Sequence, residues 1–305
     1  MILFSGIVRA VDNISFSVGF SEWVSIVGES GSGKSTLGFS IVRLVPPPGR
    51  IVGGSIFFNG IDVTRASDSM LRRIRGKDIG MIFQDPMASL DPLRTVGSQL
   101  MEVIEDHEAA YGRDAEKLAK SSLLSVGLSE NIFYSYPHQL SGGQRQRVAI
   151  ARALILKPNF IVADEPVSML DVSIRASILD ILERFKRELS ISTLFITHDL
   201  AVARLVGNRL AIMYLGKIVE EGPVDEVLGK PLHPYTKALI DSIPSIKRRE
   251  KSNFRLKDVI PDPINPPSGC RLYPRCPLAT KECMLIEPTL KTLGERRVAC
   301  HYTLE

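Results

Sequence analysis

One segment constrains the fold of this chain more than any other, the nine residues GESGSGKST at positions 28–36. A strand-like apolar run, Trp23–Val27, precedes it, and a helix-like pattern follows it. Glycines here allow backbone N–H groups to crowd around a phosphate, and the N-terminus of the following helix adds a favourable dipole. The spacing Gly-x-x-x-x-Gly-Lys-Ser in this context predicts a nucleotide phosphate-binding loop, with Lys34 on the β- and γ-phosphates and Ser35 on Mg²⁺. The residues expected to line this loop are Gly28, Glu29, Ser30, Gly31, Ser32, Gly33, Lys34, Ser35 and Thr36.

Two carboxylates follow a second strand-like run. Asp164 and Glu165 come directly after the apolar segment 160–163. Because open α/β sheets bind ligands at the carboxyl ends of their strands, Asp164 is expected to hold Mg²⁺ there through water. Glu165 is then placed to orient and deprotonate an attacking water. A pair of solvated acids is the alternative, and the phosphate-binding loop in the same chain argues against it.

A second turn rich in serine and glycine, Leu140–Gln144, precedes another helix-like segment. A turn of this kind at a helix N-terminus can bind an anion. Taken alone, it could equally be an N-cap followed by glycines. Two anion sites in one chain suggest that they enclose a nucleotide from opposite sides.

The pattern of apolar residues favours an α/β fold. The runs at 160–163 and 193–197 are continuous, which is typical of parallel strands covered on both faces. The alternation in Ile14–Val18 predicts a further strand, and Asn59-Gly60 predicts a turn. We predict a core of residues 1–86 and 158–230, a helical subdomain of 87–157, and an irregular C-terminal extension of 231–305.

The charge and hydropathy of the chain exclude some classes of function. A net charge of +4 is only mildly basic, so no nucleic-acid partner is expected. No segment reaches the roughly 18 consecutive apolar residues that a spanning helix needs. The first ten residues are too short and too soon interrupted to serve as a signal peptide. Any work at a membrane is therefore expected to depend on partners.

All four cysteines lie in the last 36 residues, at Cys270, Cys276, Cys283 and Cys300. Disulfides are disfavoured in a chain with this type of ATPase pattern, so a metal site is the sharper hypothesis. The intervening segments of five, six and sixteen residues are unlike a paired zinc ribbon. Zinc and metal-free reduced thiols stay open as alternatives.

Together these motifs resemble the ATP-binding-cassette (ABC) ATPases. The sequence LSGGQ at 140–144 is similar to the signature motif that distinguishes this family from kinases, GTPases and RecA-like motors. Gln84 resembles the Q-loop glutamine, and His198 resembles the switch histidine. Ser168–Asp171 resembles the loop that crosses the dimer interface, although Val167-Ser168-Met169 departs from the usual Thr-Ser/Thr-Ala run.

The resemblance implies a P-loop NTPase fold of the ABC type and a head-to-tail dimer. The signature turn of one subunit would cap ATP bound to the phosphate-binding loop of the other. Glu165 would be the general base, with Gln84 on Mg²⁺ and water and His198 on the γ-phosphate. Because phosphoryl transfer depends mainly on positioning and electrostatics, dimer closure would be the catalytic event. The further ATP contacts implied are Ser141, Gly142, Gly143, Gln144 and Asp171, with Phe4 stacked on adenine in an N-terminus that is short for the family.

Three stretches narrow the resemblance to the oligopeptide/dipeptide importer ATPases. They are residues 46–51, residues 75–92, and a C-terminal set from His233-Pro234-Tyr235-Thr236 to Cys300. Within that group the chain resembles the first of two paralogous ATPase subunits. The resemblance implies a heterodimer with the paralogue, or a homodimer, docked through residues 87–110 on two membrane permease subunits at the cytoplasmic face of the cell membrane. It also implies an extracytoplasmic solute-binding protein and a four-iron, four-sulfur cluster on the four cysteines.

Other functions stay open at this point. Similar ATPases energise uptake of peptides, nickel or oligosaccharides, and the sequence does not separate these cargoes. A soluble ABC ATPase acting on DNA or the ribosome is a different class, and a single cassette without a coiled-coil insertion argues against it. A redox-sensing binding module with vestigial hydrolysis is a third class. The residues that argue against it are the intact Lys34, Asp164, Glu165 and His198.

Overall fold

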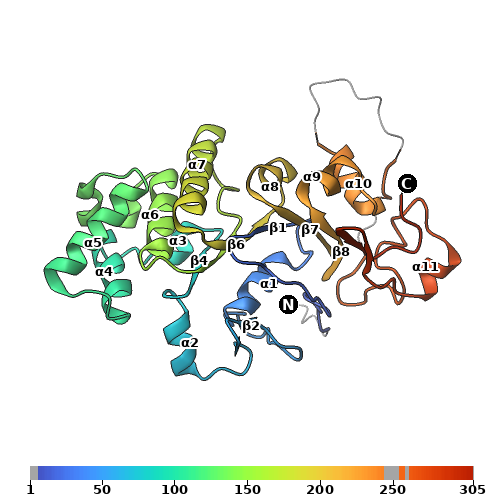
Figure 1. Ribbon diagram of the computed structural model, residues 1–305, viewed down its shortest axis with the longest axis horizontal. Coiled ribbons are helices and arrows are strands. Elements are labelled where there is room, and N and C mark those ends of the chain that lie inside the picture. The colour runs from blue at the N-terminus through green and yellow to red at the C-terminus, as the bar shows by residue number, and fades with distance from the viewer. Residues whose placement is uncertain (1–5, 244–253, 258–260, 305) are drawn as a thin grey trace, which may run out of the picture. The chain divides into compact units, whose positions relative to one another are not determined.

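The structure, a computed structural model, describes residues 6–243, 254–257 and 261–304 (Figure 1). The chain divides into two units. The first unit comprises residues 1–17, 24–37 and 197–305, and the second comprises residues 18–23 and 38–196. The division at 86, 158 and 230 expected from the motifs is a different one, and it stays a prediction.

The second unit contains three parallel strands built from strongly apolar segments. β4 (Ile79–Ile82), β5 (Phe160–Asp164) and β6 (Ser192–Thr197) pair in that order. Every residue of β5 and β6 is buried, as expected for strands enclosed on both faces. The short strands β2 (Phe57–Phe58) and β3 (Ile61–Asp62) form a hairpin. Its turn, Asn59-Gly60, has φ values of 48° and 81°, which confirms the predicted turn.

Helices make up most of the remainder of the second unit. Residues 87–157 are mainly helical, as the sequence predicts, and α4 and α5 pack through fully buried aliphatic side chains such as Leu100, Ile104 and Leu123. The α-helices are α2 (Asp68–Ile74), α3 (Pro86–Ser89), α4 (Val96–Asp106), α5 (Gly112–Ser125), α6 (Gly142–Leu154) and α7 (Val172–Leu189). Two 3₁₀ helices, η1 (Glu130–Tyr134) and η2 (Pro137–Gln139), lead into α6.

The first unit is built on a mixed sheet. β1 (Trp23–Val27) pairs in parallel with β7 (Arg209–Tyr214), and the order continues through β8 (Lys217–Pro223), β10 (Arg296–Val298) and β9 (Lys291–Leu293) by antiparallel pairing. Its helices are α8 (Leu200–Val206), α9 (Val224–Gly229), α10 (Pro234–Asp241) and α11 (Lys281–Leu285), and α1 (Lys34–Ile41) begins in it. The strand predicted for Ile14–Val18 is wrong, because these residues have no regular secondary structure.

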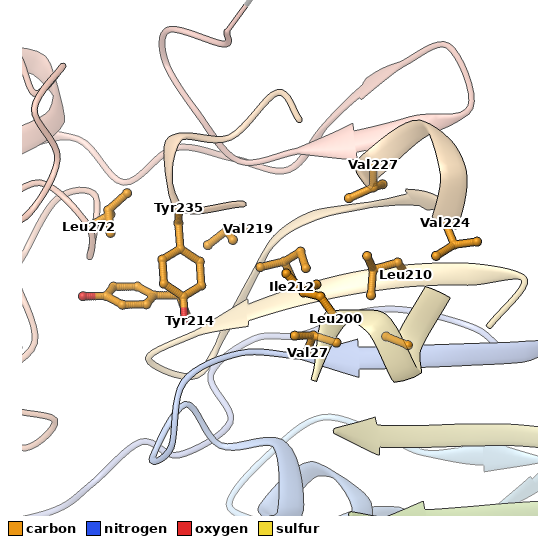
Figure 2. Close-up of a cluster of buried hydrophobic side chains, with 11 residues drawn as sticks. Val27, Leu200, Leu210, Ile212, Tyr214, Val219, Val224, Val227, Tyr235 and Leu272 are labelled. Carbon is orange, nitrogen blue, oxygen red and sulfur yellow. The ribbon is translucent and has the colours of Figure 1, made fainter. Parts of the chain in front are cut away.

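Figure 2 shows the buried core of the first unit. Val27 of β1 and Leu200 of α8 lie beside Ile212 of β7, and Tyr214 packs against Tyr235 of α10 with ring centroids 4.7 Å apart. Leu272, from the cysteine-containing region, lies at the tyrosine end of this core. The core therefore joins the strand that leads into the phosphate-binding loop to the C-terminal extension.

A buried polar pair anchors the start of that extension. The carboxylate of Glu220 in β8 is fully buried and accepts the backbone N–H groups of Leu232 and His233, each at 2.9 Å. The ring Nδ1 of His233 accepts the backbone N–H of Tyr235 at 3.1 Å. Burial lowers the pKa of His233 to about 3, so the ring is neutral at pH 7. These bonds fix the beginning of α10.

Within the described ranges, we find no helix with both the length and the apolar content required to cross a membrane.

Candidate nucleotide-binding site

The phosphate-binding loop lies between β1 and α1, as its sequence context predicts. Gly31 and Gly33 have φ values of 79° and 100°, a region that favours glycine. A Cβ atom at Gly33 would lie 1.8 Å from the carbonyl oxygen of Ala10, and one at Gly28 would lie 2.0 Å from that of Met213. Close backbone approach therefore requires glycine at both positions, and at Gly33 the backbone conformation requires it as well.

Two side chains of the loop are held in a way that suits a phosphate ligand. Lys34 is only 5% exposed, and its Nζ donates to the carbonyl oxygens of Gly28 at 2.8 Å and Glu29 at 3.0 Å. The hydroxyl of Ser32 is buried and has no hydrogen-bond partner among the described residues. A buried hydroxyl without a partner is costly, and an anionic oxygen would satisfy it. The loop thus fits the phosphates of a nucleotide.

In the second unit, parallel register brings Gln84 and Glu165 to the same sheet edge. Ile82 of β4 pairs with Ala163 of β5, so the residues two positions further along each chain lie side by side. Gln84 Nε2 donates to Glu165 Oε2 at 3.5 Å. Asp164, the last residue of β5, is 2% exposed. The structure therefore places an amide and two carboxylates where the sequence predicts the water- and Mg²⁺-binding groups.

Glu165 has an unusual backbone conformation. Its φ is 46°, in the left-handed region that residues with a Cβ rarely adopt. Its backbone N–H donates to the carbonyl oxygen of Ile196 at 2.9 Å, which holds the turn after β5 in place. Such strain in a non-glycine residue is common where a side chain must be aimed at a ligand.

The signature turn 140–144 serves as a helix cap in the structure. Ser141 is the N-cap of α6, and its hydroxyl accepts the backbone N–H of Gln144 at 3.3 Å. In turn, the side-chain oxygen of Gln144 accepts the backbone N–H of Ser141 at 2.9 Å, which completes a capping box. A Cβ at Gly143 would lie 2.7 Å from Cγ2 of Ile174, so this glycine lets α6 pack closely on α7. The N-cap alternative is therefore realised, and an ATP-capping role stays a prediction.

The remaining predicted site residues are distributed as follows. Asp171 is the N-cap residue of α7, and His198 is exposed directly after β6. Phe4 lies outside the described residues. The roles assigned to these residues stay predictions.

Sequence reasoning missed two residues that contact the phosphate-binding loop. Tyr235 Oη accepts the backbone N–H of Glu29 at 2.9 Å, and the guanidinium of Arg275 pairs with the Glu29 carboxylate at 2.7 and 3.0 Å. They are 206 and 246 positions away from Glu29 along the chain. No local pattern predicts contacts at that separation, although both residues lie in motifs that carry the family resemblance.

The four cysteines line one small cavity, together with His233, Tyr273 and His301. All four thiols are free. Burial, reinforced by neighbouring thiols, raises the pKa of Cys270 and Cys300 to about 11 and raises that of Cys276. The described residues contain no group of three or more His, Cys, Asp or Glu that could hold a metal ion. The four thiols therefore share one site, as their clustering in the sequence predicts, and a metal on them stays a prediction.

Comparison with known proteins gives concordant matches. Residues 11–168 match the family model described as ABC transporter, and residues 219–283 match the one described as oligopeptide/dipeptide transporter, C-terminal region. The chain is 45% identical to a probable peptide ABC transporter ATP-binding protein of Sinorhizobium fredii, over 97% of this chain and 83% of the relative. It is 41% identical to the dipeptide transport ATP-binding protein DppD of Escherichia coli, over 97% of this chain and 92% of the relative.

A solved structure extends this likeness to the fold. A dimeric ATP-binding cassette in a post-hydrolysis state, bound to ADP and Pi, is 33% identical with a TM-score of 0.66. The match covers 73% of this chain and 94% of that one.

Proposed function

This chain belongs to the ABC transporter family of ATPases, and from that premise we propose that it powers the import of peptides across the cytoplasmic membrane. The fold class expected from the sequence is confirmed, since the chain is an ABC-type P-loop cassette with an α/β sheet. One observation carries the peptide assignment: residues 219–283 match a region named for oligopeptide/dipeptide transporters. Relatives whose names give peptide or dipeptide transport align with 97% of the chain.

ATP hydrolysis follows from the family, and the site suggests how residues divide the work. Lys34 and the backbone of the phosphate-binding loop hold the β- and γ-phosphates. Mg²⁺, when bound, neutralises charge on the phosphates, and Ser35, Gln84 and Asp164 are the residues that would hold it. Glu165 orients the attacking water and takes its proton. The Gln84–Glu165 contact of 3.5 Å supports a shared role at that water.

The same proposal includes an assembly. The cassette pairs head to tail with a paralogous ATPase subunit, or with a second copy of itself, so that Ser141 and Gly143 of one subunit close on ATP held by the other. Residues 87–110 dock on two permease subunits at the cytoplasmic face of the membrane, and an extracytoplasmic solute-binding protein supplies the peptide. The dimeric state of the solved cassette supports the pairing.

We also propose that the four cysteines hold a four-iron, four-sulfur cluster. The donor set supports this, because four thiols and no carboxylate line the cavity, and thiolates are the usual ligands of such clusters. When bound, the cluster would cross-link the loops of the extension. An anaerobic preparation is expected to be coloured and to contain iron. A colourless, metal-free preparation made without oxygen would exclude the cluster and leave reduced thiols.

Uptake in cells tests the transport proposal. In a strain that carries this chain only as the variant, Lys34→Ala is expected to abolish uptake of labelled di- and oligopeptides. Lys117→Ala, which removes an exposed lysine paired with Asp114, is the control and should leave uptake intact. Normal peptide uptake in the Lys34 variant, with loss of nickel or oligosaccharide uptake, would assign the other cargo instead. Loss of none of these would favour an ATPase without a transport role.

A further inference from the structure

Arg275, which lies next to Cys276, is fixed by contacts on several sides. Its guanidinium makes two hydrogen bonds to the carboxylate of Glu29, Nη1 to Oε2 at 2.7 Å and Nη2 to Oε1 at 3.0 Å. Nε donates to the carbonyl oxygen of Lys257 at 3.1 Å, and Nη1 lies 3.4 Å from the hydroxyl of Tyr214. The side chain is only 9% exposed. A two-point pair of this kind has a defined geometry as well as a charge attraction.

Glu29 is the second residue of the phosphate-binding loop, and its backbone is also held. Its N–H donates to the hydroxyl of buried Tyr235 at 2.9 Å. Its carbonyl oxygen accepts from Lys34 Nζ at 3.0 Å and from the backbone N–H of Ser32 at 3.2 Å. The position of Glu29 is therefore coupled to the lysine that meets the phosphates. Arg275 controls the side chain of the same residue.

A second arginine, Arg271, follows Cys270 and contacts the support of the loop at another point. It pairs with the carboxylate of Asp12 and donates to the carbonyl oxygen of Leu215. The next residue, Gly216, donates its backbone N–H to the carbonyl oxygen of Ser32 at 2.8 Å. The segment 270–276 therefore reaches the phosphate-binding loop through two arginines, one adjacent to each of its cysteines.

The segment itself is ordered by short-range bonds that involve the cysteines. Tyr273 N–H donates to the carbonyl oxygen of Cys270 at 3.0 Å, and Cys276 N–H donates to that of Leu272 at 2.9 Å. Cys270 N–H donates to the carbonyl oxygen of Cys283 at 2.8 Å, which ties the segment to the backbone of a third cysteine. A change at the cysteines that shifts this hydrogen-bonded backbone therefore also moves Arg275.

We infer that Arg275 is a positioning residue for the phosphate-binding loop, through which the integrity of the four-thiol site sets the affinity for nucleotide. The inference rests on the proposed nucleotide site and adds a mode of regulation to it. Disruption of the thiol site lowers nucleotide affinity, because Glu29 and the lysine bonded to it lose their alignment. The water-activating step at Glu165 is unchanged, so the Kd of ADP and the KM of ATP rise more than kcat falls.

The test is equilibrium titration of the purified full-length chain with MgADP. Arg275→Ala is expected to weaken binding by about 5- to 150-fold, the usual range for coupling between two sites. Arg275→Lys keeps the charge but cannot make the two-point hydrogen bond to the Glu29 carboxylate. Its affinity for MgADP should therefore lie between those of the wild type and the alanine variant. Arg297→Ala is the matched control, because Arg297 makes another arginine–glutamate pair, with Glu221, in the β10–β8 region. It should change the Kd by less than about twofold.

A double-mutant cycle then tests the connection to the cysteines. Cys276→Ser should weaken MgADP binding in the wild-type background and add little when Arg275 is already alanine, because both changes act through one contact. Cys300→Ser, on the opposite side of the thiol set from the arginines in sequence, serves if Cys276→Ser does not fold. The inference requires that the serine variant weakens MgADP binding when Arg275 is present and adds little when Arg275 is alanine.

Two results would overturn the inference. One is an Arg275→Ala variant that binds MgADP as tightly as Arg297→Ala; the other is a cysteine variant whose effect is the same in both backgrounds. Failure of the wild-type chain to bind MgADP would instead refute the nucleotide site itself. If the alanine variant has a lower midpoint of thermal unfolding, the affinity of the Arg275→Lys variant for MgADP decides the test instead.

Discussion

The buried histidine at the start of the C-terminal extension should make the stability of this protein fall in mild acid. His233 is 1% exposed, and its Nδ1 accepts a backbone N–H, so the folded state requires the neutral ring. Burial lowers its pKa from 6.5 to about 3. Below pH 6.5 the unfolded chain takes up a proton that the folded chain excludes. Stability contributed by the neutral ring is therefore complete above pH 6.5 and is lost as the pH falls towards 3.

The size of this effect follows from the interval between the two pKa values. The interval is about 3.5 pH units, and one unit corresponds to about 1.36 kcal/mol, so the loss approaches 5 kcal/mol at pH 3. At pH 5 it should be roughly 2 kcal/mol. Glu220, which accepts the His233 N–H, has a pKa raised by burial, so its protonation in acid acts in the opposite direction. A variant of the histidine alone is therefore needed.

Urea unfolding between pH 7.5 and 5 provides the assay. His233→Asn removes the titration and keeps a side-chain acceptor at the N-cap of α10. The wild type should lose stability relative to the variant, by up to about 1.4 kcal/mol for each pH unit below 6.5. If the free energies of unfolding of the two proteins changed in parallel with pH over this range, His233 would titrate alike in the folded and unfolded chains. The predicted loss of stability in acid would then be wrong.

Three further predictions concern the site. Gly33→Ala should abolish MgADP binding, because φ at this position is 100° and the added Cβ would lie 1.8 Å from the Ala10 carbonyl oxygen. Gly229→Ala is the control, because no atom lies within 4 Å of its added Cβ. If the two variants bound MgADP with the same affinity, the requirement for glycine at position 33 would be contradicted. Gly143→Ala should lower stability by roughly 1–3 kcal/mol in urea unfolding, because its Cβ would lie 2.7 Å from Ile174. An unchanged midpoint would show that α6 and α7 can separate without cost. Gln84→Ala should lower kcat about 10- to 100-fold, and kcat should fall more than MgADP affinity does, because Gln84 contacts Glu165 as well as lying among the residues that would hold Mg²⁺. A loss confined to affinity would assign Gln84 to nucleotide binding instead.

Much of the fold and the nucleotide loop could be predicted because the signals are local. The strand–loop–helix context of residues 28–36, the buried runs that form β5 and β6, and the Asn59-Gly60 turn each depend on neighbouring residues only. The strand predicted at Ile14–Val18 fails because alternation over five residues does not supply a pairing partner. Strand formation depends on a neighbour that the sequence pattern does not name.

Contacts between residues that are far apart along the chain cannot be predicted from local sequence patterns, for a related reason. The four cysteines are clustered in an irregular segment of the sequence, and such clustering predicts a common site. The arginines between them gave no such signal, because an arginine is most often a solvated side chain. Only the fold places Arg275 against Glu29, 246 positions earlier in the chain.

The role of Glu165 as the general base is tested most directly by ATP turnover of the assembled cassette with Glu165 changed to glutamine. Glutamine keeps the size of the side chain but cannot accept the proton of the attacking water. The Glu165→Gln variant is expected to bind ATP as tightly as the wild type and to hydrolyse it about 100- to 10,000-fold more slowly, trapping a closed dimer. Glu183→Gln, at an exposed position of α7, should retain full turnover. Hydrolysis near the wild-type rate in the Glu165 variant would contradict the assignment of the general base.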